Sequence, residues 1–92
     1  MFELTKFKRD VLTVMAGLEN PNGLEIKAEL DDYYNTAINH GRLYPNLDSL
    51  VEKGFIEKSK HDERTNAYEL TDAGRTLLED RRDWETQYFD FD

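Results

Sequence analysis

The residues best suited to catalysis or metal binding are 20 carboxylates and 2 histidines, and their spacing forms no such site. His40 and His61 lack metal-ligand spacing, and the pairs Asp31-Asp32 and Glu79-Asp80 are typical of solvated helix faces. Cysteine is absent, which excludes disulfides, thiolate zinc sites and a cysteine redox switch. The sequence therefore predicts no enzyme, no cofactor and no metal site.

A run of basic and amide side chains between positions 58 and 66 points to a different chemistry, the binding of nucleic-acid phosphates. Its members are Lys58, Lys60, His61, Arg64, Thr65 and Asn66. A local basic bias of this kind favours phosphate contact, even though the whole chain has a net charge of −8. The alternative is a solvated hairpin tip, in which Asp62 and Glu63 pair with the neighbouring cations.

A second group of candidate DNA contacts lies between positions 39 and 49. Arg42 is the first choice for reading a base, because a guanidinium can bond to a guanine edge through two hydrogen bonds. The further candidates are Asn39, His40, Tyr44, Asn46 and Ser49. Asn39 could equally cap a helix, His40 could be a packed side chain, and the Tyr44 ring could pack on the preceding helix. For Arg42 and Ser49, the alternative to a DNA contact is a solvated surface side chain.

Cations also open the chain, and aromatic residues close it. Lys6, Lys8 and Arg9 begin the first expected helix, where helix-terminal amides attract phosphate, although a plain surface face is equally expected. Four of the 11 aromatic residues fall in the last nine positions. Large aromatics gathered at one end favour a protein interface, and packing back on the first helix is the alternative. The predicted dimer interface comprises Leu77, Trp84, Tyr88, Phe89 and Phe91.

Apolar spacing predicts the elements that position these side chains. Helices are expected over 5–18 with Thr5 as N-cap, over 24–34 with Ile26, Leu30, Tyr33 and Tyr34 inward, over 39–53, and over 73–88 with Thr71 as N-cap. Strands are expected over 55–60 and 65–71. Pro45 implies that the third helix starts after Asn39 or bends near Gly41.

This order predicts a mainly α fold with a small β-hairpin (α+β): a winged helix–turn–helix with three helices, a two-stranded wing and a C-terminal dimerisation helix. We assign residues 1–72 to DNA binding and residues 73–92 to dimerisation within one compact domain. In such an arrangement the third helix enters the major groove and the hairpin lies along the DNA backbone. The predicted partners are double-stranded DNA and a second copy of the chain.

The net charge of −8 opposes DNA binding, which normally depends on a surplus of lysine and arginine. An acidic surface also suggests a halophilic source, and it motivates the alternative function of an acidic protein-interaction module or DNA mimic. No apolar run approaches the roughly 20 residues of a membrane helix, and the N-terminus has no signal-peptide pattern. We therefore expect a cytoplasmic protein.

Two motifs resemble the PadR-like family of winged-helix regulators. The first is Gly41-Arg42-Leu43-Tyr44-Pro45-Asn46-Leu47-Asp48-Ser49-Leu50, followed by a charged-Lys-Gly turn at Glu52-Lys53-Gly54. The second is the stretch from Arg64 through Tyr68-Glu69-Leu70-Thr71-Asp72-Ala73-Gly74. The run from Phe7 to Leu18 is similar to the haloarchaeal branch, which includes repressors of archaeal viruses. The resemblance implies DNA binding, dimerisation through the last helix and repression, without a separate ligand-binding domain.

Overall fold

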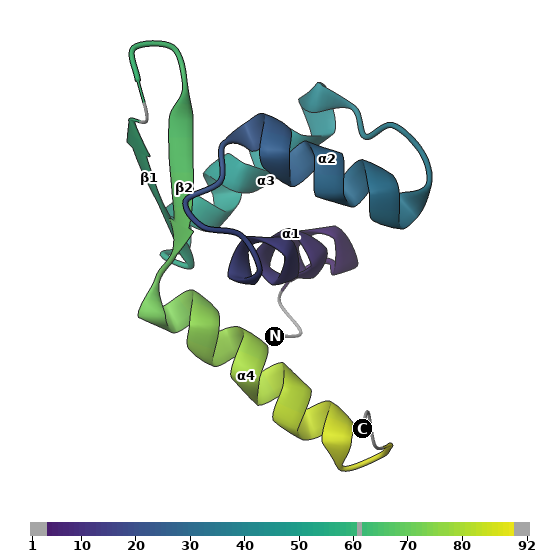
Figure 1. Cartoon of the computed structure of the whole chain (residues 1–92). Coiled ribbons are helices and arrows are strands. Elements are labelled where there is room, and N and C mark those ends of the chain that lie inside the picture. The colour runs from purple at the N-terminus through teal and green to yellow at the C-terminus, as the bar shows by residue number, and fades with distance from the viewer. Residues whose placement is uncertain (1–3, 61, 90–92) are drawn as a thin grey trace.

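The computed structural model describes residues 4–60 and 62–89 and shows the predicted winged-helix order. The elements are α1 Lys6–Ala16, α2 Gly23–Tyr34, α3 His40–Glu52, β1 Ile56–Lys60, β2 Asn66–Leu70 and α4 Asp72–Thr86. Figure 1 shows α1 between α2 and α4, with the hairpin rising beside the three-helix body and α4 running away from it. Among the described residues, no helix is both long enough and apolar enough to cross a membrane.

Side-chain caps define where each helix begins. Thr5, Asn39 and Thr71 each accept a hydrogen bond from a backbone N–H of the first turn, which confirms these three predicted N-caps. At α2 the sequence analysis missed a full capping box. The Asn22 side chain accepts from the Glu25 N–H at 2.8 Å, and the Glu25 carboxylate accepts from the Asn22 N–H at 2.9 Å.

One apolar core joins the three helices to the hairpin. Its buried members are Leu4, Phe7, Val11, Leu12, Met15, Ile26, Leu30, Ile38, Leu43, Leu47, Leu50, Ile56 and Tyr68. Leu43, Leu47 and Leu50 are fully buried, so α3 is held along its whole length and its opposite face is left to solvent. Tyr33 was expected on the inner face of α2, but this was wrong: it is 70% exposed, because Leu30 and Tyr34 already cover the core there.

The α3 helix starts at His40, one residue after Asn39, and contains Pro45 in its second turn. Proline lacks a backbone N–H, so the carbonyl of Gly41 four residues earlier has no helical donor. Gly54 follows the helix in a left-handed conformation, with φ of 81°, which glycine adopts without steric cost.

The hairpin and α4 are joined to the end of α3 by a short set of contacts. Ile56 pairs with Leu70 across the antiparallel strands, and both strands are shorter than predicted. The Thr71 hydroxyl donates to the Gly54 carbonyl at 2.7 Å, and the Thr71 N–H donates to the Phe55 carbonyl at 3.1 Å. A Cβ at Gly74 would overlap that same Phe55 carbonyl oxygen. Backbone contact at Gly74 thus fixes where α4 starts.

The far half of α4 leaves the body. Gly74 is its buried residue, and Leu77 and Leu78 pack partly against the core. The helix ends at Thr86, so the predicted extension to Tyr88 was too long by two residues. Similarly, α1 ends at Ala16, two residues before the predicted end at Leu18.

Candidate nucleic-acid interface

A polar groove lies where the N-terminus of α2, the first half of α3 and the wing meet. It has a volume of about 180 Å³. Its lining residues are Asn22, Gly23, Leu24, Tyr44, Arg64, Thr65, Asn66 and Tyr68. Four of the predicted DNA contacts, Tyr44, Arg64, Thr65 and Asn66, are therefore brought together. Sequence reasoning missed the α2 contribution, although the pattern Asn22-x-x-Glu25 is a readable sign of a helix start.

The Tyr44 ring packs against the first residue of α2, as its structural alternative predicted. A Cβ at Gly23 would lie 2.7 and 2.8 Å from two ring carbons of Tyr44 and would overlap its hydroxyl oxygen. The absence of a side chain at Gly23 thus lets a phenol hydroxyl lie beside the first N–H groups of α2. Hydroxyl and helix-terminal N–H groups are both donors suited to phosphate oxygens.

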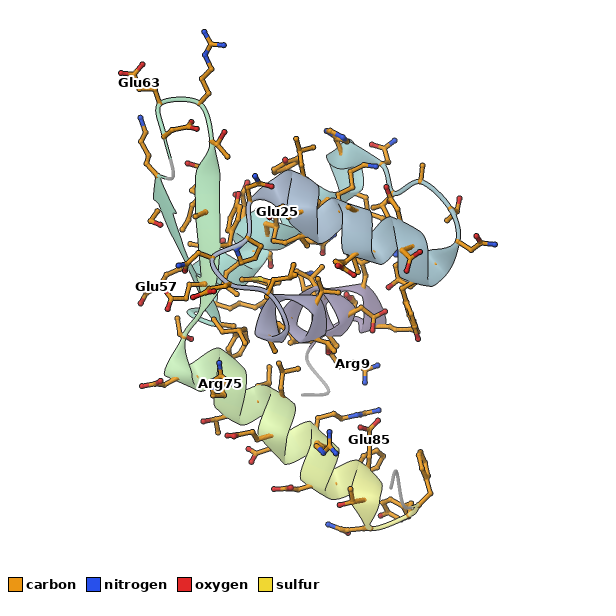
Figure 2. The ribbon with its side chains drawn as sticks, in the orientation of Figure 1. Arg9, Glu25, Glu57, Glu63, Arg75 and Glu85 are labelled. Atoms are coloured by element: carbon orange, nitrogen blue, oxygen red, sulfur yellow. The ribbon has the colours of Figure 1, made fainter. Side chains whose placement is uncertain are left out.

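The wing tip is held by one carboxylate. Asp62 Oδ1 accepts from the Arg64 N–H at 2.8 Å and from the Thr65 N–H at 2.9 Å. Asp62 therefore shapes the turn, whereas Lys60 and Arg64 are exposed. Figure 2 shows Glu63 at the outer end of the hairpin, pointing into solvent. His61 lies outside the described residues.

Carboxylates also border the exposed side of α3. Asp48 lies 3.9 Å from the Lys58 ammonium, a partly exposed pair between α3 and β1. Glu52 is exposed one turn further along α3. Burial, with the nearby Asp48 carboxylate, raises the pKa of Tyr68. Lys58 therefore has a carboxylate beside it, whereas Lys60 and Arg64 extend from the hairpin as exposed cations.

Arg42 lies on a different flank of α3 from Tyr44. It is exposed, and its guanidinium lies over the Phe7 ring, 4.1 Å from the ring centroid. Its described contact is thus to α1 rather than to the wing. The side chain of Asn46 donates to the Arg42 backbone carbonyl at 2.6 Å, so its amide is turned toward its own helix.

The remaining candidates at α3 differ in their surroundings: one caps the helix, one is exposed and one is half-buried. Asn39 Oδ1 accepts from the Gly41 N–H at 2.6 Å, which confirms its capping role. His40 is exposed, with its ring centroid 5.9 Å from that of Tyr44, so of its two alternatives the packed histidine does not hold. Ser49 is half-buried.

The three cations of α1 point to different surroundings. The Lys6 ammonium lies 3.0 Å from Asp10 Oδ2, within α1 itself. Lys8 is half-buried. Figure 2 shows Arg9 extending from α1 toward α4, away from the wing. These residues therefore do not form one cationic surface with the hairpin.

The connection from α2 to α3 is held by Asp31. Its Oδ2 accepts from the Lys27 ammonium at 2.7 Å, and its Oδ1 accepts from the Ile38 N–H at 2.6 Å. These two hydrogen bonds, that from Lys27 first, lower the pKa of Asp31 below 3.8. The carboxylate thus holds the segment that leads into α3.

The predicted dimer residues form an exposed aromatic surface at the end of α4. Trp84, Tyr88 and Phe89 are 48%, 67% and 57% exposed, and the rings of Trp84 and Tyr88 lie 5.2 Å apart. The Arg81 guanidinium lies 4.7 Å from the Trp84 ring centroid. Leu77 packs instead against the core of its own chain. Phe91 lies outside the described residues.

Known proteins share this sequence pattern and fold. The pattern of the transcriptional regulator PadR-like family matches residues 11–80. RosR of H. salinarum, in crystals grown from NaBr, is 49% identical, with a TM-score of 0.91 over 98% of this chain and 81% of RosR. RosR in the complex named RosR-S1 is 48% identical, with a TM-score of 0.93 over 99% of this chain and 80% of RosR.

A more distant structure shares the fold alone. F93 from STIV, a winged-helix DNA-binding protein, is 17% identical, with a TM-score of 0.77 over 96% of this chain and 97% of F93. No curated protein matches the chain significantly. The match to the family pattern spans most of the chain and the RosR structures align over nearly all of it, so the chain belongs to the PadR-like family of transcriptional regulators.

Proposed function

We propose that the chain is a homodimeric, DNA-binding transcriptional repressor that recognises a pseudo-palindromic operator with α3 and the wing. The observation that carries this proposal is the groove in which Tyr44, Arg64, Thr65 and Asn66 meet the N-terminus of α2. Donors from three separate elements converge there, as a DNA backbone requires. Repression would follow from occlusion of a promoter by the bound dimer in the cytoplasm.

The donors divide into two roles. The wing and the α2 terminus bind phosphates, through Arg64, Lys60 and the Tyr44 hydroxyl, and set the position of α3. Arg42 reads a base after its guanidinium leaves the Phe7 ring. A cation–π contact at an exposed site is worth about 0.5–1 kcal/mol, which a bidentate contact to guanine, at about 1–3 kcal/mol, offsets.

The dimer is formed by residues 73–92, while residues 1–72 bind DNA. The exposed Trp84, Tyr88 and Phe89 support this division, because large aromatics left uncovered at one end are typical of protein interfaces. A two-fold dimer places two α3 helices about one DNA turn apart, which predicts a pseudo-palindromic site.

The DNA proposal is tested by fluorescence anisotropy with duplexes from the upstream region of the gene and with a random-sequence pool, over a potassium chloride series. Arg42→Ala should weaken binding to the selected DNA sequence by roughly 1–3 kcal/mol and leave binding to random DNA unchanged. Arg64→Ala should weaken binding to both DNAs. It should also reduce by about 1 the slope of the logarithm of the binding constant against the logarithm of the salt concentration. Arg75→Ala, on the α4 side in Figure 2, is the matched control.

Two results would count against this assignment. Failure of the wild type to bind either the upstream DNA or the pool would reject DNA binding and favour the acidic protein-interaction module, for which Asp48 and Glu52 on α3 provide the charge. Equal losses on selected and random DNA for Arg42→Ala would make Arg42 a phosphate contact.

The dimer is tested by sedimentation equilibrium of the wild type and Trp84→Ala, with Leu24→Ala as a control. Leu24 is 60% exposed and lies on α2. We expect a dimer for the wild type and the control and a weaker dimer for Trp84→Ala. If the wild type is a monomer and still binds the selected DNA, the proposed dimer is rejected and the proposed DNA interface is retained.

A further inference from the structure

An ammonium group of the chain itself lies in a small cage between α1 and α2. The Lys6 Nζ lies 3.0 Å from Asp10 Oδ2, 5.1 Å from the ring centroid of Tyr34 and 5.8 Å from that of Tyr33. The two rings are tilted by 54° with their centroids 5.3 Å apart. The Tyr34 hydroxyl donates to the same Asp10 oxygen. Two aromatic faces and a carboxylate are the groups that recognise organic ammonium ions.

An apolar groove continues from this cage along α1 and α2. Its volume is about 390 Å³, within the range of small-molecule sites. Its lining residues are Asp10, Thr13, Val14, Glu29, Leu30, Asp32 and Tyr33. A second hollow of about 220 Å³ shares Thr13, Val14 and Glu29 and extends to Leu18. The cage therefore opens onto a surface able to hold an apolar body.

The charge around the groove has one sign. Of its lining residues, Asp10, Glu29 and Asp32 are carboxylates and none is basic. Lys6, which reaches Asp10 from outside that lining, is 67% exposed along its side chain, so it covers the cage loosely. The charge and the apolar floor together fit a cation with an attached hydrophobic group.

We propose that this cage and groove bind a lipophilic organic cation, whose ammonium replaces that of Lys6. The positive head would lie against the Tyr33 and Tyr34 faces and the Asp10 carboxylate. Its apolar part would lie along Val14 and Leu30. Lys6 is then an internal competitor, since it occupies the head position in the free protein.

The site is also connected to the proposed DNA-reading helix, an extension that rests on the proposed function. The Tyr34 ring lies 6.3 Å from the Phe7 ring, centroid to centroid, and the Phe7 ring carries the Arg42 guanidinium at 4.1 Å. A ligand that moves Tyr34 thus acts two contacts away from Arg42. We propose that the bound cation alters DNA affinity through this contact series.

Binding is tested by isothermal titration with benzyltrimethylammonium chloride, with benzyl alcohol as the uncharged probe. We expect wild type to bind the cation and not the alcohol. Lys6→Ala should bind roughly two- to tenfold more tightly, because its competitor is gone. Tyr33→Ala should bind more weakly. Leu24→Ala, which shortens an exposed apolar side chain at the opposite end of the same helix, should match wild type.

The proposal fails if Lys6→Ala binds no more tightly than wild type, if benzyl alcohol binds equally well, or if Leu24→Ala loses binding while Tyr33→Ala retains it. Absence of binding to wild type and to Lys6→Ala would also reject it. Lys6 and Tyr33 are exposed, so circular dichroism should show that both variants fold.

The effect on DNA is measured by anisotropy at constant ionic strength, with benzyltrimethylammonium chloride replacing potassium chloride. We expect the dissociation constant of the selected DNA to change at least twofold in wild type and to stay constant in Tyr33→Ala. An unchanged constant at saturating ligand would reject the effect on DNA and keep the cation site. Loss of the proposed DNA function would leave the titration result unaffected.

Discussion

The substitution Gly74→Ala tests whether backbone contact at the start of α4 holds the fold together. In an α-helix this change normally stabilises by up to about 1 kcal/mol, because alanine is the better helix former. Here the new Cβ would overlap the Phe55 carbonyl oxygen and lie 3.1 Å from Leu70 Cδ2. The Phe55 carbonyl also accepts from the Thr71 N–H, so it cannot move away without weakening that hydrogen bond.

The expected result is a net loss of stability. Overpacking costs about 1–3 kcal/mol, and a weakened hydrogen bond adds about 0.5–1.5 kcal/mol, against the gain in helix propensity. We therefore expect Gly74→Ala to lower the free energy of unfolding by about 1–3 kcal/mol. For a domain of this size, each 1 kcal/mol lowers Tm by about 4–8 °C.

The assay is urea unfolding followed by circular dichroism at a fixed protein concentration, with Gly17→Ala as the matched control. A Cβ at Gly17 would lie 3.6 Å from the Val14 carbonyl oxygen, an ordinary contact, so this variant should be neutral or stabilised by up to about 1 kcal/mol. If Gly74→Ala were as stable as wild type or more stable, the proposed close packing at Phe55 would be refuted.

Three further predictions concern the pH dependence and the core. The hydrogen bonds from Lys27 and the Ile38 N–H lower the pKa of Asp31, so their stabilisation is present above about pH 3.8 and is lost as pH falls through the folded value. Asp31→Asn should be less stable than wild type at pH 7 and should lose less stability on acidification, as measured by thermal melts at a series of pH values. Burial and a hydrogen bond to a carboxylate raise the pKa of Tyr34 to about 12, so wild type should lose stability between about pH 10 and 12, and Tyr34→Phe should lose less in the same melts. Leu47→Ala should cost about 2–5 kcal/mol in urea unfolding, because Leu47 is fully buried, and a loss below 1 kcal/mol would contradict its central place in the core.

Most of the fold could be predicted because its signals are local. The apolar spacing of each helix and the cap residues Thr5, Asn39 and Thr71 lie within a few positions of one another, and the structure confirms them. The capping box at Asn22 was equally local and was overlooked. Tyr33 was misplaced because a helical period alone does not say how wide the buried stripe is.

The arrangement of the site was harder to predict because it depends on contacts between distant parts of the chain. Arg42 lies over Phe7, a residue of another helix, and no local pattern indicates that contact. The groove requires Gly23 to lie under Tyr44, which depends on how α2 and α3 cross. Sequence reasoning therefore found which residue types gather near the wing, but not which of them converge.

The short joint at Thr71 and Gly74 has a mechanical consequence for the proposed dimer. Beyond Gly74, α4 continues for 12 residues to Thr86, or about 18 Å of helix. If its far end joins two copies, a 10° change in direction at the joint displaces that far end by about 3 Å relative to the DNA-binding body of the same chain. This displacement is close to the 3.4 Å rise of one base pair. The rigidity of the contact at Gly74 would then determine how much variation in the spacing of the two operator half-sites the dimer tolerates.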